Sequence, residues 1–180
     1  MKTTLAVILL TFLYTSSVSN DLHVHDVVNK IKEKVIVYYI PPEPDPVQLE
    51  CMALNIYFES ALEPREGKIA IGQVVLNRVE HSDYPNTVCE VVKQGIHYNN
   101  GLPVKNKCQF SWYCDGLEDE PWKGHRWYES YDIAHKLLSG YPFYDFAEGS
   151  LFYHARYVKP WWAKHYERVA TIGQHIFYRM

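Results

Sequence analysis

Two glutamates four positions apart, Glu59 and Glu63, are the residues of this chain whose type and spacing could do chemistry. Glu59 extends an apolar stripe through Met52 and Ile56, because residues at i, i+4 and i+7 lie on one face of a helix. A carboxylate at the end of a buried stripe is costly to ionise, and burial raises its pKa. Such a group can donate a proton near neutral pH, so Glu59 is a candidate general acid.

Both glutamates also have a structural interpretation. Glu59 could cap a helix or form a salt bridge with Arg65 or Arg78, and structural ion pairs also perturb carboxylate pKa values. Glu63 could be a second reactive carboxylate, because two neighbouring carboxylates raise one pKa by like-charge repulsion. It could equally pair with Arg65 or cap the next helix. Pro64 disfavours helix at Glu63, so the first helix is expected to fray or end there.

Helices and one hairpin must position these groups. The apolar residues of 67–79 surround much of a helix, which predicts a central helix, and Gly72 within it allows a close neighbour. Aromatic and apolar residues at helical spacing predict an amphipathic helix over 127–138. Alternation over 169–178 across Gly173-Gln174 predicts a closing β-hairpin.

The N-terminus indicates export. Residues 1–19 combine one lysine, an apolar run and small residues, which is typical of a signal peptide. The apolar run is shorter than the ~20 residues that span a bilayer, although an uncleaved anchor is the alternative. Residues 20–46 form an N-terminal arm with a proline-rich linker, and 47–180 form the catalytic domain. His23 and His25 have no third ligand nearby, so neither a metal site nor a cofactor is predicted.

Composition limits the class of protein. About 160 residues remain after export, enough for one domain with a real core, and we expect a monomer. The formal net charge of −3 argues against a nucleic-acid partner, since such proteins are usually strongly basic. It also means that bulk charge does not recruit an anionic substrate.

The cysteines are even in number, which in an exported chain indicates two disulfides. Three pairings are possible, and we favour Cys89 with Cys108 and Cys51 with Cys114. Cys51 has a second interpretation. A cysteine near a helix N-terminus with a downstream histidine, here His154, is how papain-like peptidases present a nucleophile.

Four blocks in order resemble one family. IYFESALEP followed by GKIAIGQVVLNRV resembles the signature of the SleB-type cell wall hydrolases, the spore-cortex-lytic enzyme family. That signature is Tyr-x-Glu-x-x-x-Glu-Pro, then glycine and an apolar helix closing in Leu-Asn-Arg-Val. YPNTVCEVVKQG, KCQFSWYCDG and FYHARYVKPWW resemble its further blocks, so the likeness covers 49–180. This chain lacks the arginine of the family's Gly-Glu-Ala-Arg-Gly-Glu run, which leaves the neighbour of the carboxylate open.

The resemblance implies a lysozyme-like α+β domain, mainly helical with a small β element, that acts on peptidoglycan glycan strands. It implies Glu59 as general acid and returning base, with Glu63, or less strongly Asp115, as a second carboxylate. Glu59-Ser60 looks like the Glu-Ser pair of lytic transglycosylases, which need a single carboxylate, whereas a hydrolase normally uses two. The residues expected to contact substrate are Ser60, Gln109, Phe110, Ser111, Tyr153, His154 and Tyr157.

Three functions therefore compete. The first is glycan-strand cleavage by a lytic transglycosylase or muramidase that uses Glu59. The second is a wall amidase or peptidase that uses Cys51 and His154 or a histidine-bound zinc, although no HExxH-like motif supports the zinc version. The third is a catalytically silent wall-binding protein. All three place the chain in the periplasm or outside the cell, without stable membrane insertion once the signal is cleaved, and a phage endolysin remains open.

Overall fold

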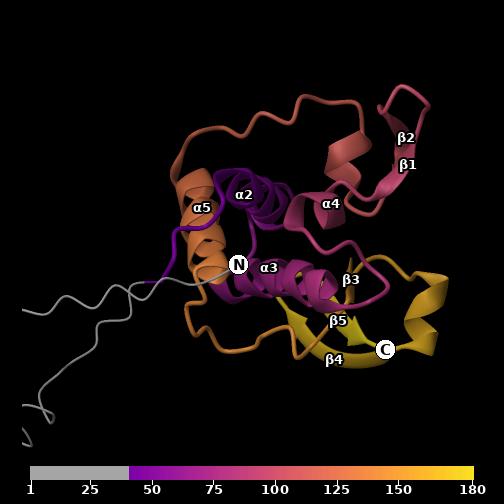
Figure 1. Cartoon of the computed structure of the whole chain (residues 1–180). Coiled ribbons are helices and arrows are strands. Elements are labelled where there is room, and N and C mark those ends of the chain that lie inside the picture. The colour runs from indigo at the N-terminus through magenta and orange to yellow at the C-terminus, as the bar shows by residue number, and fades with distance from the viewer. Residues whose placement is uncertain (1–40) are drawn as a thin grey trace, which may run out of the picture. The chain divides into compact units, whose positions relative to one another are not determined.

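The computed structural model describes residues 41–180. The predicted signal peptide and the arm as far as Ile40 lie outside the described residues. Along the described chain, the elements are α2 (Pro46–Ser60), α3 (Arg65–Glu80), α4 (Val88–Val92), β1 (Gly95–His97), β2 (Pro103–Cys108), the 3-10 helix η1 (Ser111–Cys114), α5 (His125–Leu138), β3 (Phe152–Ala155), the 3-10 helix η2 (Trp161–His165), β4 (Glu167–Ile172) and β5 (His175–Arg179) (Figure 1). Helices with small antiparallel sheets confirm the predicted α+β class.

Helix α2 begins where local chemistry dictates. The Asp45 carboxylate accepts hydrogen bonds from the backbone N–H groups of Val47 and Gln48, which satisfies donors that a helix start leaves free. Pro46 fits the first turn because proline has no backbone N–H and a helix needs none at that position. The helix ends at Ser60, before the expected position at Glu63. Glu59 thus lies in the last turn of a helix whose buried face forms the core.

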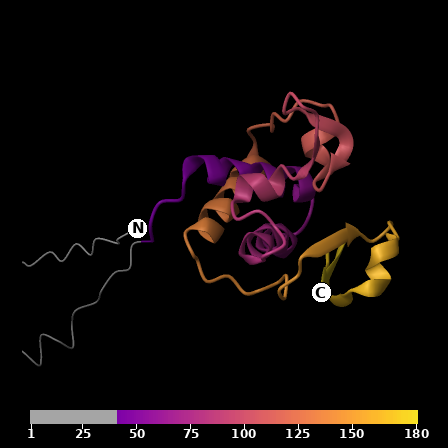
Figure 2. The ribbon, with the colours of Figure 1, turned by 45° about the vertical axis from the view of Figure 1, so that its right-hand side comes forward.

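Helix α3 is the central layer, as the sequence predicts. One core cluster joins α2, α4 and α5, and a second joins α3 to the sheet through Ile71, Val74 and Phe177. Figure 2 shows α3 between the helical layer and the strands. At Gly72, an added Cβ would lie 2.4 Å from Leu137 and 3.1 Å from Ile56. A larger side chain there would force the ends of the Leu137 and Ile56 side chains to shift, so glycine lets α3 lie close to α2 and α5.

The two sheets differ in their surroundings. The three-stranded sheet has the order β3-β5-β4 and is antiparallel throughout. Its β4–β5 connection at Gly173-Gln174 confirms the predicted hairpin. Because side chains alternate along a strand, Tyr153 faces the helices while His154 faces outward. The β1–β2 sheet is a separate two-stranded ribbon whose β1 residues are exposed.

The disulfide pairing that we favoured from the sequence is wrong. The structure joins Cys51 to Cys89 and Cys108 to Cys114. The first bond ties α2 to α4, which pack against each other, and the second closes the short turn from β2 into η1. Sequence spacing could not select this arrangement, because it depends on α4 returning to the start of α2.

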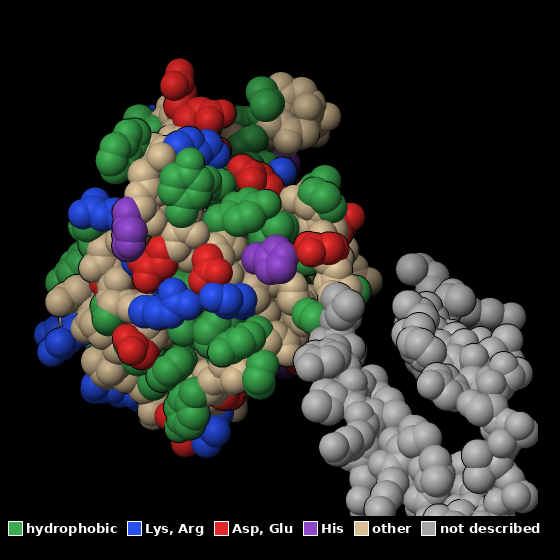
Figure 3. All heavy atoms as spheres, turned by 90° about the vertical axis from the view of Figure 1, so that its left-hand side faces the viewer, with side chains coloured by type: hydrophobic (Ala, Val, Ile, Leu, Met, Phe, Trp, Pro, Cys, Tyr) green, Lys and Arg blue, Asp and Glu red, His purple; other side chains and the backbone are tan. Residues whose placement is uncertain are grey.

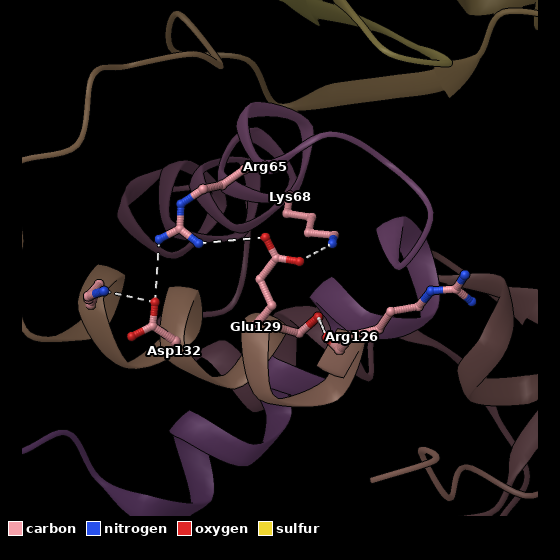
Figure 4. A network of polar contacts seen from close by, with 7 residues as sticks. Arg65, Lys68, Arg126, Glu129 and Asp132 are labelled. Atoms are coloured by element: carbon pink, nitrogen blue, oxygen red, sulfur yellow. Dashed lines mark hydrogen bonds and ion pairs between the residues drawn. The ribbon is translucent and has the colours of Figure 1, made fainter. Parts of the chain in front are cut away.

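A charged network joins α3 to α5 (Figure 4). Lys68 is 4% exposed and pairs with Glu129, which also lies 3.6 Å from Arg65. Arg65 bonds Asp132 at 3.3 Å, and Lys136 bonds the same carboxylate at 2.8 Å. Burial opposes ionisation of Glu129, but the neighbouring cations lower the pKa of its carboxyl overall. A buried lysine with one close carboxylate depends on that carboxylate for its charged state.

Among the helices of residues 41–180, none is sufficiently long and apolar to span a membrane.

We expect Glu129→Ala to lower the free energy of unfolding by about 3 kcal/mol, because it leaves the Lys68 charge buried and unpaired. Asp132→Ala is the matched control. It removes a carboxylate that is 46% exposed, so we expect a loss below about 1 kcal/mol. Urea unfolding of both variants measures the difference. Equal losses would contradict a special role for the buried pair.

Candidate active site

Glu59 lies at the end of α2, beside a pocket of about 520 Å³. The pocket is lined by Tyr57, Phe58, Glu59, Ser60, Ala61, Leu62, Glu63, Ala155, Tyr157, Gln174 and His175. Residues from the α2–α3 junction, the end of β3 and the β4–β5 turn therefore meet here. The hydroxyl of Tyr153 donates a hydrogen bond to Glu59 Oε2 at 2.9 Å. Sheet and helix together fix the orientation of the carboxyl group.

Arg78 provides the positive charge near Glu59. Its side chain is 5% exposed, and its Nε donates to the carbonyl of Leu151 at 2.8 Å. The guanidinium lies 5.2 Å from the Phe110 ring centre and 5.3 Å from the Tyr84 ring centre, which is the geometry of cation–π contacts. Arg78 forms no direct ion pair with Glu59 among the described residues. It acts on the carboxyl group through its electric field.

Burial and the neighbouring polar groups have opposite effects on the pKa of Glu59. Burial raises the pKa of the Glu59 carboxyl above its ordinary value, while the Tyr153 hydrogen bond and the Arg78 charge partly counteract the rise. Burial also raises the pKa of Tyr153 well above its ordinary value, helped by the negative charge of Glu59. Tyr153 therefore keeps its proton and acts as a donor. Glu59 has the character of an acid that can release a proton and take it back.

Glu63 shares the pocket but is held by the hairpin. Its Oε2 accepts a hydrogen bond from the backbone N–H of Gln174 at 2.8 Å. Its Oε1 lies 3.9 Å from His175 Nδ1. Gly173 has a φ of +54°, and an added Cβ there would lie 2.9 Å from Pro64 Cδ and would overlap Glu63 Oε2, so glycine suits this approach. Glu63 thus anchors the β4–β5 turn to the start of α3.

His175 completes this corner of the pocket. Burial lowers the pKa of its imidazole, although the Glu63 carboxylate opposes that effect. The ring is consequently neutral at neutral pH, and its contact with Glu63 is not an ion pair there. The His175 ring meets the Tyr153 ring edge-to-face at 5.3 Å. The hairpin therefore packs directly against the residue that orients Glu59.

The remaining predicted contact residues fall into two groups. Ser60 and Tyr157 line the pocket, but the Ser60 hydroxyl donates to the carbonyl of Ile56 at 2.6 Å within its own helix. Gln109 and Ser111 are exposed and are not among the residues that line the pocket. Phe110 is 2% exposed and lies in the core, where its ring packs against the Arg78 guanidinium.

Three further candidates lie away from the pocket. His154 faces the outer side of the sheet, where its Nε2 lies 3.0 Å from the Tyr178 hydroxyl. Cys51 is bonded to Cys89, which removes the thiol that a Cys51–His154 pair requires. That version of the peptidase hypothesis is wrong. Asp115 accepts a hydrogen bond from the backbone of Leu117 and is not among the pocket residues.

No group of three or more metal-ligating side chains occurs within residues 41–180.

The sequence does not mark Gln174 and His175 as site residues, and it offers Arg78 only as an alternative partner for Glu59. The sequence did signal a turn at Gly173-Gln174, but it did not show that this turn reaches the α2–α3 junction. Arg78 follows Val74 and Val75 on the buried surface of the predicted central helix. A charged residue at such a position was the available signal.

Known proteins resemble this chain in family and in fold. The Cell Wall Hydrolase family model matches residues 62–178, a range that includes Glu63 and begins just after Glu59. The crystal structure of the catalytic domain of the Bacillus cereus SleB protein has a TM-score of 0.56 at 23% identity, over 78% of this chain and 95% of that chain. The catalytic domain of the germination-specific lytic transglycosylase SleB from Bacillus anthracis has a TM-score of 0.59 at 24% identity, over 78% and 100%. No curated protein matches the chain. The structural likeness shows a shared fold, as the resemblance predicts.

We expect Tyr153→Phe to raise the pKa of Glu59 further, because it removes the donor that favours the ionised carboxylate. A carbon-13 NMR titration of the Glu59 side-chain carboxyl measures the change. Tyr178→Phe is the matched control, since it removes a hydroxyl on the outer face of the same sheet. A Glu59 pKa that falls or stays constant in Tyr153→Phe would contradict the role of this hydrogen bond.

Proposed function

This chain belongs to the Cell Wall Hydrolase family, and we propose that it cleaves the glycan strands of peptidoglycan with Glu59 as the general acid. The observation that carries the proposal is the environment of Glu59. A carboxyl group with a raised pKa lies at an open pocket, held by the Tyr153 hydroxyl and near the Arg78 charge. Glycosidic cleavage requires a protonated acid at the leaving oxygen, and burial provides one.

The first step transfers the Glu59 proton to the glycosidic oxygen. The bond between this oxygen and the anomeric carbon breaks, and the sugar develops an oxocarbenium-like positive charge. Glu59 becomes a carboxylate at the same time. The Tyr153 hydrogen bond and the Arg78 charge favour that ionised form, so they stabilise charge that develops during the step. The Tyr153 hydrogen bond and the Arg78 charge, which both limit the rise in the Glu59 pKa, therefore also help Glu59 to release its proton.

The second step returns the proton. We propose that the 6-hydroxyl of the same sugar attacks the anomeric carbon while the Glu59 carboxylate accepts the hydroxyl proton. The product is a 1,6-anhydro sugar, and Glu59 is again protonated. This reaction needs one carboxylate. Its assignment is supported by Glu63, because that carboxylate accepts the Gln174 N–H and serves to anchor the hairpin. The Bacillus anthracis relative is described as a lytic transglycosylase.

Hydrolysis is the second candidate, since Glu63 lines the same pocket as Glu59. In that reaction Glu63 would act as nucleophile or as base for a water molecule. The two candidate reactions use Glu59 as the same acid. They differ in the group that attacks the anomeric carbon, which is the 6-hydroxyl of the sugar in one and Glu63 or a water molecule in the other.

We propose that the enzyme acts as a monomer in an exported form, either periplasmic or secreted, with residues 1–19 as signal peptide. The disulfides Cys51–Cys89 and Cys108–Cys114 support this location, because such bonds persist in oxidising compartments.

Product analysis tests the proposed reaction. We expect wild type to release soluble fragments ending in 1,6-anhydro-muramic acid from purified peptidoglycan, and Glu59→Gln to release none, as seen by mass spectrometry. Glutamine keeps the shape of the side chain but has no acidic proton. Fragments with a reducing muramic acid would indicate hydrolysis. Cut peptide stems on intact glycan would overturn glycan cleavage altogether.

Substitutions at Glu63 separate anchoring from catalysis. We expect Glu63→Gln to retain most of the activity, because an amide oxygen still accepts the Gln174 N–H. We expect Glu63→Ala to lower the free energy of unfolding by about 1–2 kcal/mol, because it leaves that N–H without its partner. Initial rates of fragment release and urea unfolding measure the two effects. Loss of activity in a stably folded Glu63→Gln variant would instead favour the hydrolytic role.

A further inference from the structure

A concentration of positive charge follows strand β3. Residues 156–168, here called the basic segment, contain four arginines and lysines and a single acidic residue, Glu167. Glu167 is already paired with Arg179 at 2.8 Å. The whole chain has a formal net charge of −3. On the α5 side, by contrast, acidic and basic side chains lie next to one another (Figure 3).

The cations of the basic segment are free to bind a partner. Arg156, Lys159, Lys164 and Arg168 are all exposed, and none forms a salt bridge with another residue of the described chain. Arg168 donates one hydrogen bond, to the Thr171 hydroxyl at 2.6 Å. Exposed charges without partners contribute little to folding stability. The four cations lie close together in the sequence, and their main effect is a local positive potential at the surface.

Exposed aromatic side chains accompany these charges. Tyr157 is 85% exposed and Trp161 is 77% exposed, although both are large and apolar. The backbone of this segment is fixed by neighbouring side chains that pack against strand β3. Trp162 contacts Phe152 with ring centres 5.6 Å apart, and Tyr166 stacks on the same ring at 4.3 Å. Packing of these neighbours orients Trp161 outward on a fixed element.

The basic segment is continuous with the active-site pocket. Ala155 and Tyr157 line the pocket that contains Glu59. The chain then runs through η2, which lies on the side of the sheet away from α3 (Figures 1 and 2). A polymer bound at Glu59 and extending past Tyr157 would reach this surface. The partner is therefore expected to be the remainder of the same substrate.

We propose that the basic segment binds the carboxylates of the peptide stems next to the glycosidic bond that is cleaved. This inference rests on the proposed function. The peptide stems of peptidoglycan carry free carboxylates, which exposed lysine and arginine side chains bind by charge-assisted hydrogen bonds. Tyr157 and Trp161 supply apolar faces for the sugars and aliphatic side chains between these charges. A local patch of this kind offsets the net negative charge of the chain and directs the polymer into the pocket.

Binding to intact polymer provides the first test. In a Glu59→Gln background, which leaves the polymer uncut, we compare Lys159→Glu/Lys164→Glu with Lys105→Glu/Lys107→Glu. The control pair makes the same charge change at exposed positions of β2. In co-sedimentation with purified peptidoglycan at low salt, we expect the first pair to weaken binding about tenfold and the control to leave it unchanged. Added salt should reduce the difference in peptidoglycan binding between the two double variants, because it screens exposed charges.

Activity distinguishes the stems from the glycan. With Glu59 present, we expect Lys159→Glu/Lys164→Glu to raise KM about tenfold on stem-bearing peptidoglycan and to leave KM unchanged on glycan strands whose stems have been removed. Equal losses on both substrates, or none on either, would overturn the proposal. Lost binding to phosphatidylglycerol vesicles with unchanged binding to peptidoglycan would overturn it in favour of a membrane surface. If wild type cleaves neither substrate, the proposed function fails. Binding of the two Glu59→Gln variant pairs to glycan with and without stems then decides whether the segment recognises stems, because only stem-bearing glycan should lose binding to Lys159→Glu/Lys164→Glu.

Discussion

The burial of one guanidinium, that of Arg78, is the constraint on which the site depends. This side chain belongs to the central helix α3, yet it contacts the loop that leads into β3 through the Leu151 carbonyl and lies over the Phe110 and Tyr84 rings. A buried positive charge is costly unless its surroundings compensate it. Here a carbonyl, two ring faces and the field of Glu59 compensate it in part, although burial still lowers the pKa of the Arg78 guanidinium. Three distant parts of the chain are thereby held around one carboxyl group.

The loop into β3 is fixed by α3 at more than one point. Gln73 accepts hydrogen bonds from the backbone N–H groups of Phe146 and Ala147, and Asn77 donates to the carbonyl of Ser150. This loop determines where β3 begins, and β3 carries Tyr153. Polar side chains on α3 thus help to position Tyr153 for its hydrogen bond to Glu59. A short sheet becomes part of an active site because α3 holds its first strand in place.

The two glutamates that share the pocket have different surroundings, which suits them to different tasks. Glu59 accepts a hydrogen bond from the Tyr153 hydroxyl and lies in the electric field of Arg78, and both leave it able to gain and lose a proton. Glu63 accepts a backbone N–H at the hairpin turn, which fixes that turn against the start of α3. Sequence spacing favoured Glu59 as the acid but left the task of Glu63 open. Their partners, which come from elements more than ninety positions further along the chain, distinguish them.

The amino-acid sequence is enough to predict the helices around Glu59, the central position of α3, the closing hairpin, the α+β class and the family, because these follow from local periodicity, turn residues and ordered motifs. It also identified Glu59 as the group whose burial would raise its pKa. Tertiary structure alone decided the disulfide pairing, the burial of Phe110, the outward direction of His154 and the partners of both glutamates. These features arise from contacts between segments far apart in the chain, and residue spacing cannot specify them. Strand alternation, for example, predicts that Tyr153 and His154 point to opposite faces, but only packing against α3 decides which of them meets Glu59.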